Sequence, residues 1–232
     1  MNLIFIQNPI VSDSLSMPID NEKTLSIVEL ISSGGLGGNI IMSTLGVLSI
    51  FAIYILIERY STIKKASKDD DSFLKSIKNF VEQKDMQAAK TLCQNTDNPV
   101  SRMIEKGIDR IDKPMTDISA AIENQGKLEV YKMENNLANL ATIAGAAPMI
   151  GFLGTVIGMI VAFHEMASAG GNIDVEMLSK GIYTAMVTTV GGLVVGIIAY
   201  ISYNFLVSKV DKVIFLLEAR TTEFLDLLHH NE

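Results

Sequence analysis

The 232-residue chain has few charged residues, which make up 19 % of it, and it contains one cysteine and no tryptophan. A soluble domain usually carries about 25 % charged residues, so the composition favours a membrane protein and argues against a disordered chain. A single cysteine, Cys93, excludes an internal disulfide framework. The net charge of −7 argues against a nucleic-acid partner. Because His164, His229 and His230 are the only histidines, we expect no Cys/His metal site, and no cofactor is predicted.

Charge is missing altogether from three long stretches, residues 30–57, 135–164 and 181–208. They are 28, 30 and 28 residues long, whereas a helix crosses a bilayer with about 20 apolar residues. The sequence therefore predicts an all-α, polytopic membrane protein with three transmembrane helices. The second and third helices are expected to extend far into the cytoplasm.

Lysine and arginine are distributed unevenly around these spans. Residues 58–136 carry fourteen of the 19, whereas residues 1–39 carry one. Positive side chains favour the cytoplasmic side of a membrane, so we expect the N-terminus outside and the C-terminus in the cytoplasm. The predicted division is an extracytoplasmic segment with a candidate amphipathic helix (1–37), transmembrane helix 1 (38–58), a cytoplasmic helical loop (59–136), transmembrane helix 2 (137–165), a short extracytoplasmic link (166–180), transmembrane helix 3 (181–207) and a cytoplasmic helical tail (208–232).

The cytoplasmic parts have the apolar periodicity of helices. In the loop, breaks are predicted near residues 83–85, 95–99 and 112–114, and the third loop helix is expected to run to Ile111. No proline lies between Pro114 and Pro148, which predicts one continuous helix from about residue 115 to 167. The tail continues the third span with a heptad pattern, typical either of a self-associating coil or of a helix packed on its neighbours. The pattern is formed by Val210, Ile214, Leu217, Thr221, Phe224 and Leu228.

The second and third spans lack ionisable side chains at mid-depth, so this chain by itself cannot hold a proton carrier there. They do contain hydroxyl groups, which either line an ion pathway or bond to the backbone of their own or a neighbouring helix. The candidate pathway residues are Thr155, Thr184, Thr188 and Thr189. Small residues lie beside them and favour close helix packing, and Pro148 is expected to bend its helix. The candidate packing residues are Pro148, Gly151, Gly154, Gly158, Gly192 and Gly196.

The residues of these spans are similar to those of a known family. The run Ala147–Met159, APMIGFLGTVIGM, resembles the second-span signature of the MotA/TolQ/ExbB proton-channel family. The run Gly181–Ile197, GIYTAMVTTVGGLVVGI, followed by Tyr203-Asn204, resembles its third-span signature. The resemblance covers the chain from about residue 34 to its end, and three spans fit the ExbB branch better than MotA, which has four.

This resemblance implies a pentamer in the bacterial inner membrane, around a pore that holds the single spans of two ExbD-like partners. Each partner supplies an aspartate that takes up and releases protons, and the resulting motion energises a TonB-like protein that opens outer-membrane transporters. The pore threonines of the family correspond to Thr155 and Thr189. Well-known ExbB and TolQ members have a glutamate five residues before the second of these. This chain has Thr184 there, so the role of that glutamate is not carried over.

Other functions fit the same sequence. A TolQ-like subunit or a stator subunit of a gliding or secretion motor shares the architecture, and a membrane scaffold would hold partners without conducting. An intramembrane enzyme is disfavoured, because the spans contain no Ser/His, paired-Asp or HExxH arrangement. A neighbouring gene for a small single-span protein with a mid-membrane aspartate would distinguish a channel from a scaffold.

Overall fold

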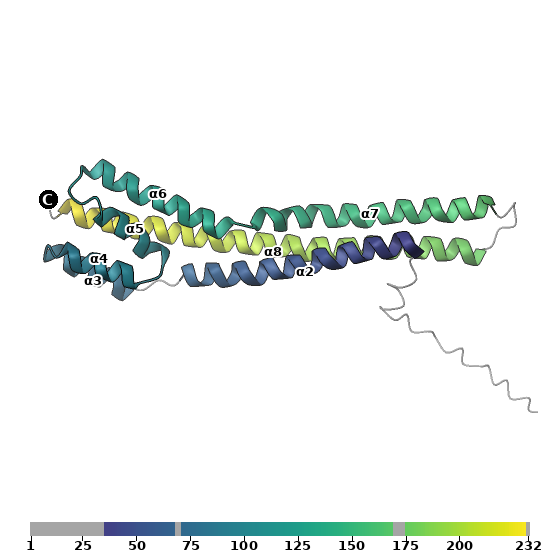
Figure 1. Cartoon of the computed structure of the whole chain (residues 1–232), viewed down its shortest axis with the longest axis horizontal. Coiled ribbons are helices and arrows are strands. Elements are labelled where there is room, and N and C mark those ends of the chain that lie inside the picture. The colour runs from purple at the N-terminus through teal and green to yellow at the C-terminus, as the bar shows by residue number, and fades with distance from the viewer. Residues whose placement is uncertain (1–34, 68–70, 169–174, 231–232) are drawn as a thin grey trace, which may run out of the picture.

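The computed structural model describes residues 35–67, 71–168 and 175–230, and every regular element in these ranges is a helix (Figure 1). Three helices are long and apolar enough to cross a membrane, which confirms the predicted fold class. The candidate amphipathic segment at residues 21–33 lies outside the described residues. The helices are α2 (Gly35–Ala66), α3 (Asp71–Glu82), α4 (Met86–Asn95), α5 (Pro99–Ile108), α6 (Met115–Glu134), α7 (Leu137–Ser168) and α8 (Val175–His230).

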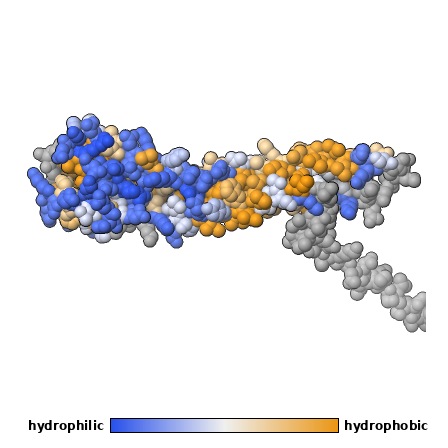
Figure 2. Space-filling view, viewed as in Figure 1, coloured by the Kyte–Doolittle hydropathy of each residue, from blue (hydrophilic) through white to orange (hydrophobic). Residues whose placement is uncertain are grey.

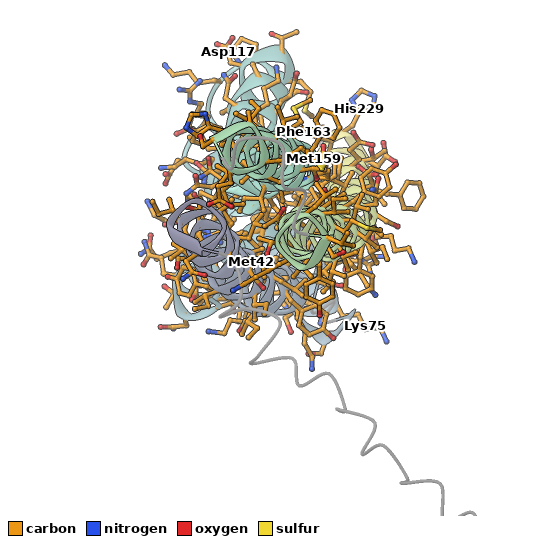
Figure 3. The ribbon with its side chains drawn as sticks, turned by 90° about the vertical axis from the view of Figure 1, so that its right-hand side faces the viewer. Met42, Lys75, Asp117, Met159, Phe163 and His229 are labelled. Atoms are coloured by element: carbon orange, nitrogen blue, oxygen red, sulfur yellow. The ribbon has the colours of Figure 1, made fainter. Side chains whose placement is uncertain are left out.

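The three spans form a triangular bundle when the molecule is viewed along its long axis (Figure 3). Each span buries one side against the other two. In α2, for example, Leu45 and Ile55 are almost fully buried, whereas Ile50 is 71 % exposed. Exposed apolar residues form a band over α2, α7 and α8, and the surface at the other end of the molecule is polar (Figure 2). This division matches a membrane segment joined to a segment in water.

The 56 residues of α8 correspond to roughly 84 Å of helix, whereas the hydrocarbon core of a bilayer is about 30 Å thick. The second half of α8 packs on α3, α5 and α6. The heptad positions Leu217 and Phe224 are buried in the core of this single chain. The heptad pattern therefore reflects a helix packed on its neighbours, one of the two alternatives that the sequence left open.

The expected continuous helix from residue 115 to 167 is wrong. Asn135 and Asn136 separate α6 from α7, and Asn136 has a left-handed backbone with φ of 64°. Asparagine is one of the few residues that adopt this conformation at low cost, so a helix can end there without proline. The sequence prediction relied on proline alone. By contrast, α7 continues through Pro148 without an interruption.

The loop helices begin and end where local side chains specify it. Asn98 caps α5, because its side chain accepts a hydrogen bond from the backbone of Ser101 at 2.6 Å, and Pro99 occupies the first turn. The first two predicted breaks agree with the gaps before α4 and α5. The third loop helix is shorter than predicted, since α5 ends at Ile108 and a series of turns follows.

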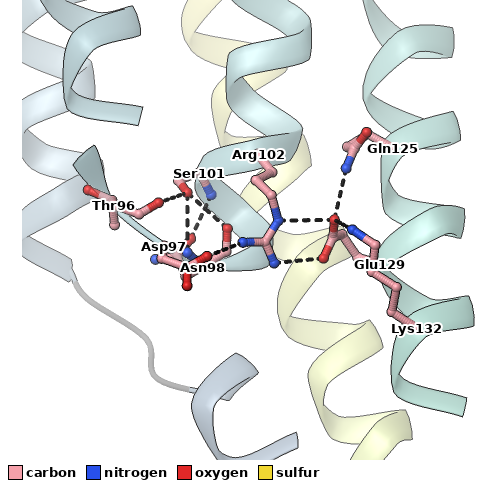
Figure 4. A network of polar contacts seen from close by, with 8 residues as sticks. All are labelled: Thr96, Asp97, Asn98, Ser101, Arg102, Gln125, Glu129 and Lys132. Atoms are coloured by element: carbon pink, nitrogen blue, oxygen red, sulfur yellow. Dashed lines mark hydrogen bonds and ion pairs between the residues drawn. The ribbon is translucent and has the colours of Figure 1, made fainter. Parts of the chain in front are cut away.

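A buried carboxylate joins α5 to α6 (Figure 4). Glu129, which is 2 % exposed, accepts hydrogen bonds from Arg102 at 2.7 and 3.0 Å, from Gln125 at 2.8 Å and from Lys132 at 2.9 Å. Burial by itself would raise the pKa of Glu129, but the bonds from Arg102 and Lys132 outweigh burial and hold the pKa below its ordinary value. The ionised form is therefore the one that stabilises the fold.

We expect Glu129→Gln to destabilise the protein by about 2 kcal/mol at neutral pH, because the substitution removes charge-assisted hydrogen bonds. A carboxylate with a lowered pKa stabilises the fold above its unfolded pKa, and this stability is lost as the pH falls through the folded pKa. The wild type should therefore lose stability on acidification, and the variant should lose less. Denaturant unfolding of the detergent-solubilised protein at several pH values measures both effects.

Glu123→Gln is the matched control for this prediction. Glu123 lies on the same helix, but its side chain is 65 % exposed and pairs with Lys127 at 2.7 Å. An exposed pair of this kind contributes about 0.5 kcal/mol or less. Equal destabilisation by the two substitutions would show that the Glu129 network adds nothing to stability beyond a surface ion pair.

Candidate functional site

The closest helix contact in the membrane segment joins α7 to α8, and it depends on residues without large side chains. A methyl group added to Gly192 would lie 2.6 Å from the carbonyl oxygen of Ala147 and 2.8 Å from the Cα atom of Gly151. A methyl group on Gly151 would lie 2.8 Å from the carbonyl oxygen of Thr188. These distances are shorter than ordinary carbon contacts, so the two backbones touch directly at this level.

Small residues continue this contact in both directions along the two helices. Toward the polar end of the molecule, Gly196 packs against the ring of Pro148. Toward the other end, Gly158 packs against Ala185, and Gly181 against Ala162. All the candidate packing residues of the sequence therefore lie at the α7–α8 contact, including Gly154, where a methyl group would meet the side chain of Thr188.

Two threonine hydroxyls bridge α7 and α8 next to the glycine contact. Thr155 donates to the carbonyl oxygen of Ala185 at 3.1 Å, and Thr189 donates to the carbonyl oxygen of Gly151 at 3.2 Å. The two hydroxyl oxygens also contact each other. The bonds run between helices and not back to the carbonyl four residues earlier in the same helix, so the glycine contact is what brings the hydroxyls within reach.

The threonine pair has more hydrogen-bond contacts than hydrogens. Two hydroxyl hydrogens serve three contacts, one to Ala185, one to Gly151 and one between Thr155 and Thr189. The hydrogens can therefore exchange between contacts by rotation, without movement of heavy atoms. Both side chains are half-buried, which leaves part of the pair open to a group from outside the chain. Such a pair can donate to a carboxylate or accept from a carboxylic acid or water.

The other two candidate threonines are not part of this pair, although Thr188 lies at the same helix contact and shares the Ala185 carbonyl with Thr155. Thr188 is 1 % exposed, and its hydroxyl donates to the carbonyl oxygen of Ala185 in its own helix at 2.7 Å. Thr184 lies at the contact with α2, where its methyl group would be 3.1 Å from a Cβ atom on Gly38. The structure therefore brings Thr155 and Thr189 together and separates Thr184 from them. Among the described residues, no three His, Cys, Asp or Glu side chains come together as a metal site.

The sequence did not indicate the role of Arg59, one of the fourteen basic residues between the first and second spans. The side chain is buried, and it donates to the carbonyl oxygen of Lys132 at 2.8 Å and contacts the carboxylate of Glu58. It thereby joins α2, about two turns before its end, to the last turn of α6, next to the break before α7. The sequence signal that could have shown this role is the Glu-Arg pair directly after an apolar span.

Comparison with known proteins extends these observations. The sequence profile of the MotA/TolQ/ExbB proton channel family matches residues 95–219, which include both threonines. An ExbB homologue assigned to biopolymer transport in Methanothermobacter thermautotrophicus is 27 % identical over 80 % of this chain and 64 % of its own length. Biopolymer transport protein ExbB of Helicobacter pylori is 39 % identical over 34 % of this chain and 54 % of its own length. The chain thus spans less than two thirds of these two relatives.

A third relative matches over a longer part of both chains. Tol-Pal system protein TolQ of Pseudomonas aeruginosa is 24 % identical over 88 % of this chain and 93 % of its own length. The comparisons therefore point to one family and to two of its branches.

Proposed function

Since the chain belongs to the MotA/TolQ/ExbB proton channel family, we propose that it is an ExbB-like subunit of an ion-driven motor in the bacterial inner membrane. In this proposal several copies, most simply five, surround the single span of an ExbD-like partner that carries a membrane aspartate. Ion flow moves the partner, and the partner energises a TonB-like protein for transport across the outer membrane. Two findings support this proposal: the three helices that can cross a membrane and the match to the family.

The observation that carries the proposal is the threonine pair in spans that contain no carboxylate. The uncharged stretches of α7 and α8 contain no Asp or Glu side chain, so the carboxylate that carries the proton must come from another chain. A carboxylate in an apolar environment has a raised pKa and takes up a proton. Beside Thr155 and Thr189, the same carboxylate would find hydroxyl donors, which favour its ionised form. Its protonation would then depend on its position, which couples ion flow to motion.

Proton flux tests the proposal directly. The chain is co-expressed and co-purified with a candidate ExbD-like partner and reconstituted in liposomes with an internal pH-sensitive dye. We expect flux in response to a proton gradient, and loss of that flux when the membrane aspartate of the partner is changed to asparagine. An intact complex that conducts no more than the aspartate variant would support the scaffold function instead.

A TolQ-like function is the second candidate, and the long match to the Pseudomonas aeruginosa protein favours it. The two functions differ in their client. Deletion of the gene should abolish energy-dependent uptake if the chain is ExbB-like, and should make the outer membrane leaky to detergents if it is TolQ-like.

Orientation is a separate prediction. We expect residues 72 and 231 in the cytoplasm and residues 20 and 172 outside, because Lys and Arg cluster between the first two spans. Single cysteines at these positions in a Cys93→Ser background are labelled in intact cells with a membrane-impermeant maleimide. Native Cys93 is buried, and burial raises its pKa to about 12, so it reacts little even in the cytoplasm. Labelling at position 231 would contradict the predicted orientation.

A further inference from the structure

We propose that a hollow between α2 and α8 binds the headgroup of an anionic phospholipid. The hollow lies where the uncharged stretch of each helix ends, after Ile57 in α2 and after Ser208 in α8. The proposal rests on the chain crossing a membrane and not on ion conduction. The hollow has a volume of about 290 Å³ and is lined by Tyr60, Ile63, Lys64, Ser67, Lys209 and Lys212.

Two aromatic rings next to the hollow indicate that it lies at the membrane boundary. Tyr60 of α2 and Phe205 of α8 stack with their ring centroids 6.1 Å apart, and both side chains are more than 40 % exposed. Tyrosine rings such as that of Tyr60 are enriched at the level of lipid headgroups. About one turn further into the spans, Ile57 and Ile201 are each 63 % exposed. They provide an apolar surface for an acyl chain whose headgroup lies in the hollow.

Among the described residues, every charged side chain that lines the hollow is a lysine. Lys64 lies 6.0 Å from the ring centroid of Tyr60, and Lys209 lies 5.5 Å from that of Phe205. In the described part of the chain, no ion pair includes Lys64, Lys209 or Lys212. Lysines at this depth bury their methylene groups and direct their ammonium groups to the interface. Three such groups around one hollow fit a phosphate.

The ligand is assigned as a lipid and not as a soluble anion because the site combines two kinds of surface. A free phosphate would bind to the lysines alone and would make no contact with the stacked rings or the exposed isoleucines. An anionic diacyl phospholipid matches both surfaces, since its phosphate and its acyl chains are joined at the membrane boundary. Basic groups at this boundary attract anionic lipids.

Native mass spectrometry of the detergent-purified full chain tests the site, with phosphatidylglycerol and phosphatidylcholine of equal chain length added at equal concentration. We expect the wild type to retain phosphatidylglycerol at least about tenfold better than phosphatidylcholine, with a preference that weakens as salt is added. The variant Lys64→Gln/Lys209→Gln/Lys212→Gln is expected to lose this preference.

The matched control is Lys75→Gln/Lys78→Gln/Lys113→Gln, which removes the same number of charges from exposed positions in the loop helices and turns. It should bind phosphatidylglycerol like the wild type. If the first variant does not fold, a photoactivatable phosphatidylglycerol bound to the wild type should label residues 60–67 and 205–212. Equal loss of binding in both variants, even labelling along the spans, or displacement of the lipid by inorganic phosphate at low millimolar concentration would overturn the proposal.

Discussion

Replacing Gly192 by leucine is expected to separate α7 from α8 and to destabilise the protein by at least about 3 kcal/mol. Even the first carbon of the new side chain would lie 2.6 Å from the carbonyl oxygen of Ala147 and 2.8 Å from Cα of Gly151. These are backbone atoms, which cannot move aside by changing a rotamer. Thermal unfolding in detergent measures the loss of stability, and native mass spectrometry measures the loss of assembly.

Gly145→Leu is the matched control, because Gly145 lies on α7 and a methyl group there meets nothing within 4 Å in this chain. Its stability should change little. Gly192→Ala tests the same contact in a graded way and should give a smaller loss than leucine. Wild-type stability of Gly192→Leu would mean that α7 and α8 are not held together at this contact.

Removing both hydroxyls of the threonine pair is expected to abolish ion-driven work while the fold and the assembly remain. Valine has nearly the shape of threonine, so Thr155→Val/Thr189→Val keeps the packing at Gly151 and Gly192. Hydrogen bonds between helices in a membrane contribute about 0.6 kcal/mol each, so the loss of stability should be about 1 kcal/mol. Proton flux in liposomes with the partner is expected to fall by about tenfold or more, because the partner carboxylate loses its donors.

Two further variants make this result specific to the pair. Thr155→Ser/Thr189→Ser keeps both hydroxyls and should keep most of the flux. Thr44→Val/Thr142→Val removes two hydroxyls that donate to their own helices at 2.9 and 2.8 Å, so it should conduct like the wild type. Unchanged flux in the valine variant of the pair would show that its hydroxyls serve structure alone.

The sequence by itself determined the class of fold and the number of spans. Uncharged stretches of 28 to 30 residues that cross a bilayer form helices, since each backbone N–H and C=O group then has a hydrogen-bond partner within the same segment. It also determined the breaks before α4 and α5, because the capping side chains of Asp85 and Asn98 and the ring of Pro99 act on their immediate neighbours. The small residues of the second and third spans could also be predicted to pack helices together, because their spacing is visible in the local sequence.

The break between α6 and α7 was decided by tertiary structure. Asn136 permits a left-handed residue but does not require one. The contacts that keep α6 from continuing straight into α7 join residues far apart in the sequence. Arg59 donates to the carbonyl oxygen of Lys132, and Glu129 accepts from Arg102 of α5. Neither partner is visible in a local window of sequence.

The direction of the threonine hydrogen bonds was decided in the same way. From the sequence, Thr155 and Thr189 could equally bond to their own helices or to a neighbour. Backbone contact at Gly151 and Gly192 brings the carbonyl oxygens of the opposite helix within reach of both hydroxyls. Periodicity shows which residues share a face, but the distance between two faces is set only when the helices pack.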